Sequence, residues 1–189
     1  LKIPNNLKYI LLNSKISNIR RIAKYILIDL DNSYSLVVHL GMSGRLKINK
    51  QNYIRVKHDH FMIFFKNEKV LVFNDQRKFG FIDIVKTNNL EKKRYIFNLG
   101  IDALSKKLDY QFLYNRISKS EVPIKQILLN QRIIAGIGNI YASEILFDCN
   151  ISPLTPGKNL KISHIMKLIL SIRRILRKAI KFGGSSIKN

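Results

Sequence analysis

The sequence predicts an α+β protein in which an antiparallel β-sandwich domain is followed by a helical domain. In the first half, short runs rich in β-branched and aromatic residues alternate with turn-like segments at hairpin spacing. From Tyr110 onward, apolar residues recur at helical spacing instead. We place the domain boundary in the loop around residues 98–100, which gives domains of residues 1–98 and 99–189.

The first domain is expected to begin with a short helix over residues 7–12, where apolar side chains recur at helical spacing. Strands are expected over residues 24–30, 35–40, 45–48, 60–65, 70–73 and 79–85. Polar or glycine-containing segments separate these runs, and the clearest are residues 31–33 and 41–44. Strands of this length joined by short turns favour an antiparallel arrangement.

The last helix is the clearest element of the second domain. The apolar residues that share one of its faces are Ile162, Ile165, Ile169, Ile172, Leu176 and Ala179. Most of its basic side chains lie elsewhere on the helix, as expected for an amphipathic helix at a surface. Residues 182–184, Phe-Gly-Gly, are expected to end it, because glycine readily adopts the left-handed conformation of a helix C-terminus. Pro153 and Pro156 separate this helix from the preceding one.

The charge balance points to a polyanionic partner. The chain has 34 Lys plus Arg against 12 Asp plus Glu, a formal net charge of +22. The alternative is compositional drift, since Lys, Asn and Ile are frequent throughout. No apolar run is long enough to span a bilayer, so we expect a cytoplasmic protein with no membrane partner, and a monomer. Cys149 is the single cysteine, which excludes an intramolecular disulfide and a thiolate zinc cluster within this sequence.

Two segments of the first domain carry side chains that packing alone does not require. Residues 39–44, His-Leu-Gly-Met-Ser-Gly, place a methionine between glycines at the end of a predicted strand. The alternative is that Met42 fills the core, where a flexible thioether packs well. Residues 75–80, Asp-Gln-Arg-Lys-Phe-Gly, offer cations to phosphates or base edges and an aromatic ring to a base. The alternative here is a solvated hairpin tip with Phe79 folded inward.

Residues 131–144 form a third segment, Gln-Arg-Ile-Ile-Ala-Gly-Ile-Gly-Asn-Ile-Tyr-Ala-Ser-Glu. Its Gly-Ile-Gly-Asn part opens an apolar-periodic helix. Unshielded N–H groups at the positive end of the helix dipole suit a phosphate. Asn139 is expected either to cap this helix or to donate its amide to a phosphate. A plain glycine turn between two helices is the alternative.

These three segments, in this order and spacing, resemble the signature blocks of the formamidopyrimidine-DNA glycosylase family. Further matches are residues 20–25 (Arg-Arg-x-Ala-Lys-Tyr), 57–60, 99–100, 124–125 and 183–186. The resemblance implies a β-sandwich beside a helix-two-turn-helix domain. It also implies a bifunctional DNA glycosylase/AP lyase that removes 8-oxoguanine and formamidopyrimidines from damaged double-stranded DNA. The related endonuclease VIII family shares the fold but generally lacks the 39–44 block and the Arg-x-Phe-Gly sequence.

The resemblance also assigns roles to single residues. Met42, Arg77 and Phe79 would fill the void left by a flipped nucleotide, Met42 and Phe79 as apolar wedges and Arg77 as a probe of the orphaned base. Lys24 matches a strand lysine linked to β-elimination; a solvated strand-edge lysine is the alternative. Lys78 stands where family members often carry an arginine, which keeps the charge but loses bidentate geometry.

Four further residues are expected to contact DNA by the same resemblance. His58 matches a DNA-contacting histidine, Lys125 a lysine near the lesion pocket, and Asn139 a phosphate-contacting asparagine. Lys119 is the best candidate for a DNA-binding lysine in a stretch where the family tends to be more basic. A metal site built from His39, His58 and His60 was weighed as well, but no acidic or cysteine partner stands at ligand spacing, so we expect no metal.

The family pattern includes two segments that this sequence does not contain. Family members begin with a mature Pro-Glu dipeptide, whose proline amine attacks the sugar C1′ and whose glutamate handles protons. They end in a four-cysteine zinc finger that grips DNA. Because the sequence starts at Leu1 and stops at Asn189, we expect a fragment without a cofactor of its own, with zinc in the full-length protein.

Three other interpretations remain open at this point. The chain could be an inactive DNA-binding remnant of the family, or an endonuclease VIII-like glycosylase. It could also bind RNA, because the helix-two-turn-helix element occurs in a ribosomal protein too, although that interpretation gives Met42, Arg77 and Phe79 no role.

Overall fold

The computed structural model describes residues 3–184. The start of the sequence at Leu1 and the two serines of the 183–186 match lie outside the described residues. The chain divides into two compact units, Leu1–Lys93 (unit 1) and Arg94–Asn189 (unit 2). The boundary that we predicted, after Asn98, falls a few residues inside unit 2. No helix within residues 3–184 combines the length and apolar character that crossing a bilayer requires.

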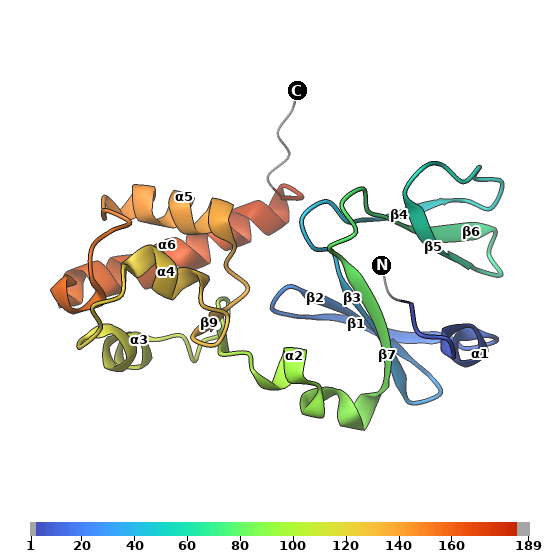
Figure 1. The fold of residues 1–189 in the computed structure, drawn as a ribbon, viewed down its shortest axis with the longest axis horizontal. Helices are drawn as coiled ribbons and strands as arrows, with labels where there is room; N and C mark the ends of the chain where they lie inside the picture. The colour runs from blue at the N-terminus through green and yellow to red at the C-terminus, as the bar shows by residue number, and fades with distance from the viewer. Residues whose placement is uncertain (1–2, 185–189) are drawn as a thin grey trace. The chain divides into compact units, whose positions relative to one another are not determined.

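Unit 1 is built almost entirely of antiparallel strands (Figure 1). Its helices are α1 (Leu7–Leu11) and the 3-10 helix η1 (Thr87–Lys92). Its strands are β1 (Ile16–Ile22), β2 (Tyr25–Leu30), β3 (Tyr34–His39), β4 (Arg45–Lys50), β5 (Asp59–Phe64), β6 (Lys69–Asn74) and β7 (Phe81–Lys86). They form a four-stranded sheet of order β1-β2-β3-β7 and a three-stranded sheet of order β4-β6-β5.

The two sheets of unit 1 share one hydrophobic core. Alternate residues of the larger sheet, such as Leu36 and Val38, pack in the same cluster as Leu71 and Phe73 of the smaller sheet. Because side chains alternate between the two faces of a strand, residues two apart reach the same core. Leu7 of α1 joins this cluster from outside the sheets. The predicted β-sandwich is therefore confirmed.

The structure departs from the predicted strands at the edges of the sheets. Strand β1 was not predicted, because most of its residues are exposed and it shows no clear alternation of burial. Its backbone pairing with β2 makes it an edge strand. Lys24 lies in the turn between β1 and β2 rather than within a strand. Strand β7 begins at Phe81, so Phe79, which we placed in the strand, lies in the loop before it.

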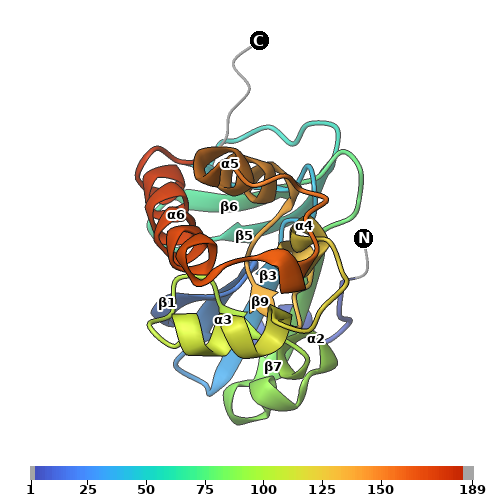
Figure 2. The same cartoon turned by 90° about the vertical axis from the view of Figure 1, so that its left-hand side faces the viewer.

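Unit 2 is mainly helical (Figure 2). Its elements are α2 (Arg94–Phe97), β8 (Ile101–Asp102), α3 (Tyr110–Ile117), α4 (Ile124–Leu129), β9 (Ile134–Ala135), α5 (Asn139–Cys149), the 3-10 helix η2 (Gly157–Asn159) and α6 (Ile162–Lys181). Helices α5 and α6 pack side by side, α3 packs on α6, and α4 packs on α5. The short strands β8 and β9 pair in parallel.

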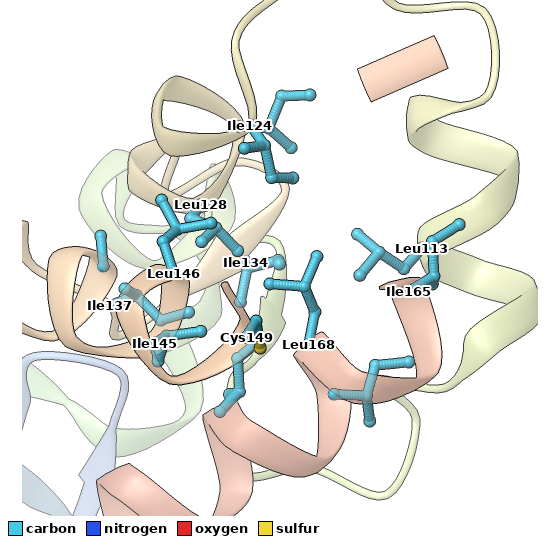
Figure 3. Packing of buried hydrophobic residues seen from close by; sticks show 14 of the residues in the cluster. Leu113, Ile124, Leu128, Ile134, Ile137, Ile145, Leu146, Cys149, Ile165 and Leu168 are labelled. Carbon is cyan, nitrogen blue, oxygen red and sulfur yellow. The ribbon is translucent and has the colours of Figure 1, made fainter. Parts of the chain in front are cut away.

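The core of unit 2 draws side chains from every large helix and from the turn before α5. Figure 3 shows Leu113 of α3, Leu128 of α4, Ile145 of α5 and Leu168 of α6 converging, with Ile137 entering from the turn. All of these side chains are fully or almost fully buried. Burial of one such aliphatic side chain stabilises the fold by about 1.5–3 kcal/mol. The turn before α5 is thus held by the same core as the helices.

Helix α6 confirms the predicted apolar stripe and its glycine ending. Ile165, Ile169 and Ile172 are buried, whereas Ile162 in the first turn is 56% exposed. At the other end, Gly183 and Gly184 adopt positive φ, and the Gly184 N–H donates to a carbonyl of the last turn at 2.8 Å. The left-handed glycines therefore stop the helix as expected.

Candidate nucleic-acid interface

The antiparallel registers bring the predicted site residues of unit 1 to one end of the sandwich. In the larger sheet, Tyr25 pairs with His39 and His39 pairs with Phe81. Lys24 immediately precedes Tyr25, Met42 follows the end of β3, and Phe79 precedes the start of β7. Because the start of one antiparallel strand lies beside the end of its neighbour, these segments meet at the same end of the sheet.

The smaller sheet presents its own loops at the corresponding strand ends. Asn74, the last residue of β6, pairs with both Arg45 and Asp59, the first residues of β4 and β5. His58 precedes β5, and the segment that begins at Asp75 follows β6. We call residues 40–44 the Met42 loop and residues 75–80 the Phe79 loop. The two loops link strands of one sheet to strands of the other.

The side chains predicted to fill the void in DNA are presented to solvent. Met42 is 71% exposed and Phe79 is 58% exposed, so neither fills the core and neither alternative interpretation holds. The Arg77 guanidinium lies over the Phe79 ring, 4.9 Å from its centroid, in a cation–π contact. Both apolar side chains are thus accessible, and the cation of the same loop lies against one of them.

The Met42 loop and the Phe79 loop are joined by a buried carboxylate. The Ser43 hydroxyl donates to Asp75 Oδ1 at 2.5 Å, and the Gly80 N–H donates to Asp75 Oδ2 at 2.8 Å. Ser43 Oγ in turn accepts from the Arg77 N–H at 3.0 Å. Burial tends to raise the pKa of Asp75, but the Ser43 hydroxyl and N–H groups of the Phe79 loop outweigh it and hold the pKa below its usual value. The carboxylate is therefore ionised at neutral pH.

Close backbone contact fixes the two loops against each other. Gly41 has φ +64°, and a Cβ there would lie 2.6 Å from the Gly80 nitrogen and 2.6 Å from the Phe79 carbonyl carbon. Both atoms belong to the backbone, so they cannot swing away as a side chain could. Glycine at position 41 is thus required for the contact between the loops as well as for turning.

A second buried carboxylate organises the basic segment before β5. Asp59 is 2% exposed and accepts from the Tyr53 hydroxyl, the Val56 N–H and the Asn74 amide, at 3.0, 2.9 and 2.7 Å. This segment includes His58, which has φ +73° and precedes the strand. His58 and His60 do not share a regular strand face as the metal alternative required, because the β5–β6 register is irregular between Asp59 and Phe61.

Lys24 lies beside His39 at the same end of the larger sheet. Partial burial lowers the pKa of the Lys24 ammonium, although much of its side chain remains exposed. Burial and then the charge of Lys24 lower the pKa of His39. His39 Nδ1 accepts from the Gly41 N–H at 3.1 Å, as a neutral imidazole does. A lysine with a lowered pKa holds a larger fraction of free amine, which suits proton transfer.

In unit 2, the turn before α5 is closed by the Gln131 side chain. Gln131 Nε2 donates to the carbonyls of Leu129 and Ile137 at 2.9 and 2.8 Å, and Oε1 accepts from the Gly136 N–H at 2.9 Å. Gly138 is the N-cap of α5, and Asn139 is its first helical residue. The Asn139 side chain therefore does not cap the helix, which leaves it exposed and available at the positive end of the helix dipole.

Lys119 and Lys125 lie in another part of unit 2. The Lys125 N–H donates to the carbonyl of Pro153, so the start of α4 lies beside the segment that follows α5. Ser120, next to Lys119, accepts through its carbonyl from the Lys158 N–H of the same segment. Asn139 lies at the opposite end of α5. The predicted DNA-contacting residues of unit 2 thus do not form a single cluster.

Comparisons with known proteins match both units. Residues 2–82 match the formamidopyrimidine-DNA glycosylase N-terminal domain, and residues 99–189 match the formamidopyrimidine-DNA glycosylase H2TH domain. A formamidopyrimidine-DNA glycosylase of Zymomonas mobilis is 43% identical over 187 residues, which are 99% of this chain and 68% of that protein. The chain belongs to the formamidopyrimidine-DNA glycosylase family.

Other members of the family support the same assignment. A formamidopyrimidine-DNA glycosylase of Rickettsia canadensis is 46% identical over 95% of this chain and 65% of its own length. A structure of Lactococcus lactis Fpg in complex with DNA containing an abasic site has a TM-score of 0.90 and 34% identity, and the match covers 97% of this chain and 68% of that one. The chain spans about 65% of the length of the Rickettsia relatives that it matches.

The structure of this family member also shows residues to which the sequence analysis gave no role. Asp75, Ser43 and Gln131 stood inside the quoted segments. The bond between Ser43 and Asp75 joins positions that only the fold brings together, whereas Gln131 bonds within its own turn. Within residues 3–184, no group of three His, Cys, Asp or Glu side chains could hold a metal ion, and Cys149 is buried. The described residues therefore do not fit a zinc site; the zinc expected in the full-length protein stays a prediction.

Proposed function

We propose that this chain is the central part of a base-excision-repair enzyme that removes oxidised purines, 8-oxoguanine and formamidopyrimidines, from double-stranded DNA and cleaves the resulting abasic site. The observation that carries the proposal is the pair of coupled loops at one end of the sandwich. They present Met42, Arg77 and Phe79 to solvent on two loops that are joined by a hydrogen bond and by close backbone contact. A duplex from which one nucleotide has been flipped needs such wedges to fill the gap.

The solved relatives support DNA as the partner. Lactococcus lactis Fpg has been determined with DNA that contains an abasic site and with DNA that contains FAPY-dG. The net charge of +22 supplies the electrostatic attraction that a phosphate backbone requires. In this proposal His58, Lys119, Lys125 and Asn139 contact the backbone or the lesion pocket.

The residues of this chain would perform the recognition of the gap and one proton transfer. Met42 and Phe79 occupy the space of the flipped nucleotide, and Arg77 donates hydrogen bonds to the orphaned base. Lys24, whose pKa is lowered by burial, assists proton transfer in the β-elimination that opens the abasic sugar. The resemblance assigns the nucleophilic proline amine and the glutamate to a Pro-Glu start that this sequence does not contain.

The test uses the protein isolated from its native cell, with its intact mass and N-terminal sequence determined first. It is incubated with a duplex that carries one 8-oxoguanine, in the presence of borohydride, which reduces and traps a Schiff base. We expect base excision, strand cleavage and a trapped protein–DNA adduct. Binding of the lesion duplex without excision or an adduct would overturn the proposed activity.

A second function, DNA binding without catalysis, is favoured by the charge alone. A net charge of +22 binds any duplex, damaged or not. This alternative predicts the same affinity for lesion and undamaged duplex and a steep dependence on salt, with a slope of about −0.9 per neutralised phosphate. A preference for the lesion duplex that persists as salt is raised would exclude it.

A further inference from the structure

We infer that Asp75 is a positioning residue that makes the Met42 loop and the Phe79 loop act as one lesion-recognition element. The inference rests on the proposed function, because it concerns how the residues that enter the DNA are held. Asp75 itself is fully buried, so it does not touch DNA. Its effect passes through the two loops.

The connection between the loops runs through one carboxylate and one hydroxyl. Each oxygen of Asp75 accepts from a different loop, Oδ1 from Ser43 and Oδ2 from Gly80. Ser43 makes a second hydrogen bond with the Phe79 loop, because its hydroxyl oxygen accepts from the Arg77 N–H. Residues that neighbour Met42 and Phe79 in the chain are thus tied to the same side chain.

The backbone of Asp75 anchors this junction to the smaller sheet. Its N–H donates to the His58 carbonyl at 3.0 Å, and its carbonyl lies 2.9 Å from His60 Nε2. The junction is therefore fixed to residues at the start of β5 as well as to the two loops. Because both the side chain and the backbone of Asp75 are hydrogen-bonded, the residue has little freedom to move with one loop alone.

An amide at this position cannot reproduce the arrangement. Asparagine carries a single oxygen, so its Nδ2 group would face either the Gly80 N–H or the Ser43 hydroxyl. Facing Gly80, it places two donors against each other; facing Ser43, it leaves the hydroxyl proton without its acceptor. Because the site is buried, water cannot restore the lost bond. Asp75→Asn therefore releases one loop from the other with little change in shape.

Loss of the hydrogen bonds between the two loops in Asp75→Asn should also affect the exposed side chains, because the loops meet closely at Gly41 and Gly80. The loops lie so close that a Cβ at Gly41 would meet the backbone of residues 79 and 80 at 2.6 Å. When the hydrogen bonds no longer hold that position, Met42 and Phe79 remain exposed but no longer present a single preformed wedge. The two side chains must then be ordered when DNA binds, and this entropic cost reduces the affinity for a duplex with an abasic site.

The experiment compares the full chain with Asp75→Asn and Ser43→Ala on two duplexes, one undamaged and one with a tetrahydrofuran abasic analogue. Affinity is measured for both, together with the fluorescence of a 2-aminopurine placed opposite the analogue, which reports on stacking by the inserted side chains. The matched control is Asp29→Asn. Asp29 accepts from Arg20 and Ser35 at the start of β3, the end away from the Met42 loop.

We expect Asp75→Asn and Ser43→Ala each to lower the preference for the abasic duplex roughly tenfold and to change the 2-aminopurine signal, with binding to undamaged duplex almost unchanged. Asp29→Asn should keep the preference even where it lowers the midpoint of unfolding. In a Met42→Ala/Arg77→Ala/Phe79→Ala background, Asp75→Asn should cause no further loss of preference, because all three side chains through which the two loops would contact DNA are gone.

Three results have distinct meanings. If the unsubstituted chain shows no preference for the abasic duplex, the proposed function fails, whatever the variants do. If the unsubstituted chain shows the preference and Ser43→Ala and Asp75→Asn keep it, the inference about Asp75 is overturned. A loss of preference by Asp75→Asn that adds fully to that of the Met42→Ala/Arg77→Ala/Phe79→Ala background also overturns it, since Asp75 would then act by another route.

Discussion

The side-chain carbonyl of Gln131 accepts a 2.9 Å hydrogen bond from the Gly136 N–H, and the amide of the same side chain donates to the carbonyl of Ile137. One side chain therefore spans the turn that leads into α5 and satisfies backbone groups on both of its sides. The turn is held in place by a polar side chain before any ligand arrives, and Asn139 follows directly.

Gln131→Glu should destabilise unit 2 and weaken DNA binding. A carboxylate can accept from Gly136 but cannot donate to Leu129 and Ile137, and it places negative charge against their carbonyls. We expect a loss of about 2–3 kcal/mol in the free energy of unfolding, measured in urea. Binding to damaged and undamaged duplex should fall together, because Asn139, which follows this turn, contacts phosphate in the proposed function.

Gln126→Glu is the matched control for that substitution. Gln126 is an exposed residue of α4, so the change in net charge is the same without the loss of the turn. Equal effects of the two substitutions on unfolding would show that the hydrogen bonds of Gln131 contribute nothing beyond charge.

Gly41→Ala should be far more damaging than Gly183→Ala. Both glycines have positive φ, +64° and +76°, so both substitutions strain the backbone by about 1 kcal/mol. Only at Gly41 would the new Cβ meet backbone atoms at 2.6 Å, whereas nothing lies within 4 Å at Gly183. We expect Gly41→Ala to lower the urea midpoint more and to lower the preference for lesion duplex. Similar midpoints for the two variants would contradict the close contact of the loops.

Met42→Ala should separate DNA recognition from stability. Because Met42 is 71% exposed, its truncation should change the free energy of unfolding by no more than about 0.5 kcal/mol. Phe73→Ala, at a fully buried position of β6, should cost about 3–5 kcal/mol. Of these two variants, we expect only Met42→Ala to reduce the preference for an abasic duplex under conditions in which both remain folded. A large loss of stability for Met42→Ala would indicate that the side chain packs in the core after all.

Asp59→Asn should flatten the dependence of stability on pH in the acid range. Burial tends to raise the pKa of Asp59, but hydrogen bonds led by the Asn74 amide lower it below the ordinary value of 3.8. The unfolded chain therefore binds this proton first, so the stabilisation is complete above the unfolded pKa and is lost as the pH falls through it toward the folded pKa.

Urea midpoints at a series of pH values test this expectation. The unsubstituted chain should lose stability steeply between about pH 5 and pH 3, and Asp59→Asn should be less stable than it at pH 7 but lose less over that range. Parallel curves for the two proteins would exclude a contribution of Asp59 to the acid response.

Much of the architecture could be predicted because it depends on local patterns. The β-rich first half, the helical second half and the glycine ending of α6 all follow from periodicity and from glycine conformations within a few residues. Strand β1 could not be predicted in this way. Its stability comes from pairing with β2, which does not appear in the pattern of an exposed edge strand.

The candidate site also has features that could be predicted from the sequence and features that could not. Met42, Arg77, Phe79 and Asn139 could be singled out because they stand in short segments whose residue types match a known family. The exposure of Met42 and Phe79 followed only from the family resemblance, since by residue type alone a lone methionine or phenylalanine is as compatible with a core as with a surface. Whether Asn139 caps α5 was likewise settled only by the position of Gly138 in the structure.

The sequence by itself determined the family of this protein and its two-part α+β organisation, because these depend on composition and on short-range order, and it singled out the side chains that we propose to enter DNA. Only the tertiary structure decided how those side chains are held. Ser43 and Asp75 are separated by 32 positions in the chain, and they meet because β3, β4, β6 and β7 pair so that their loops converge. A hydrogen bond requires atoms within about 3 Å, and contacts at such separations along the chain are made by the fold alone.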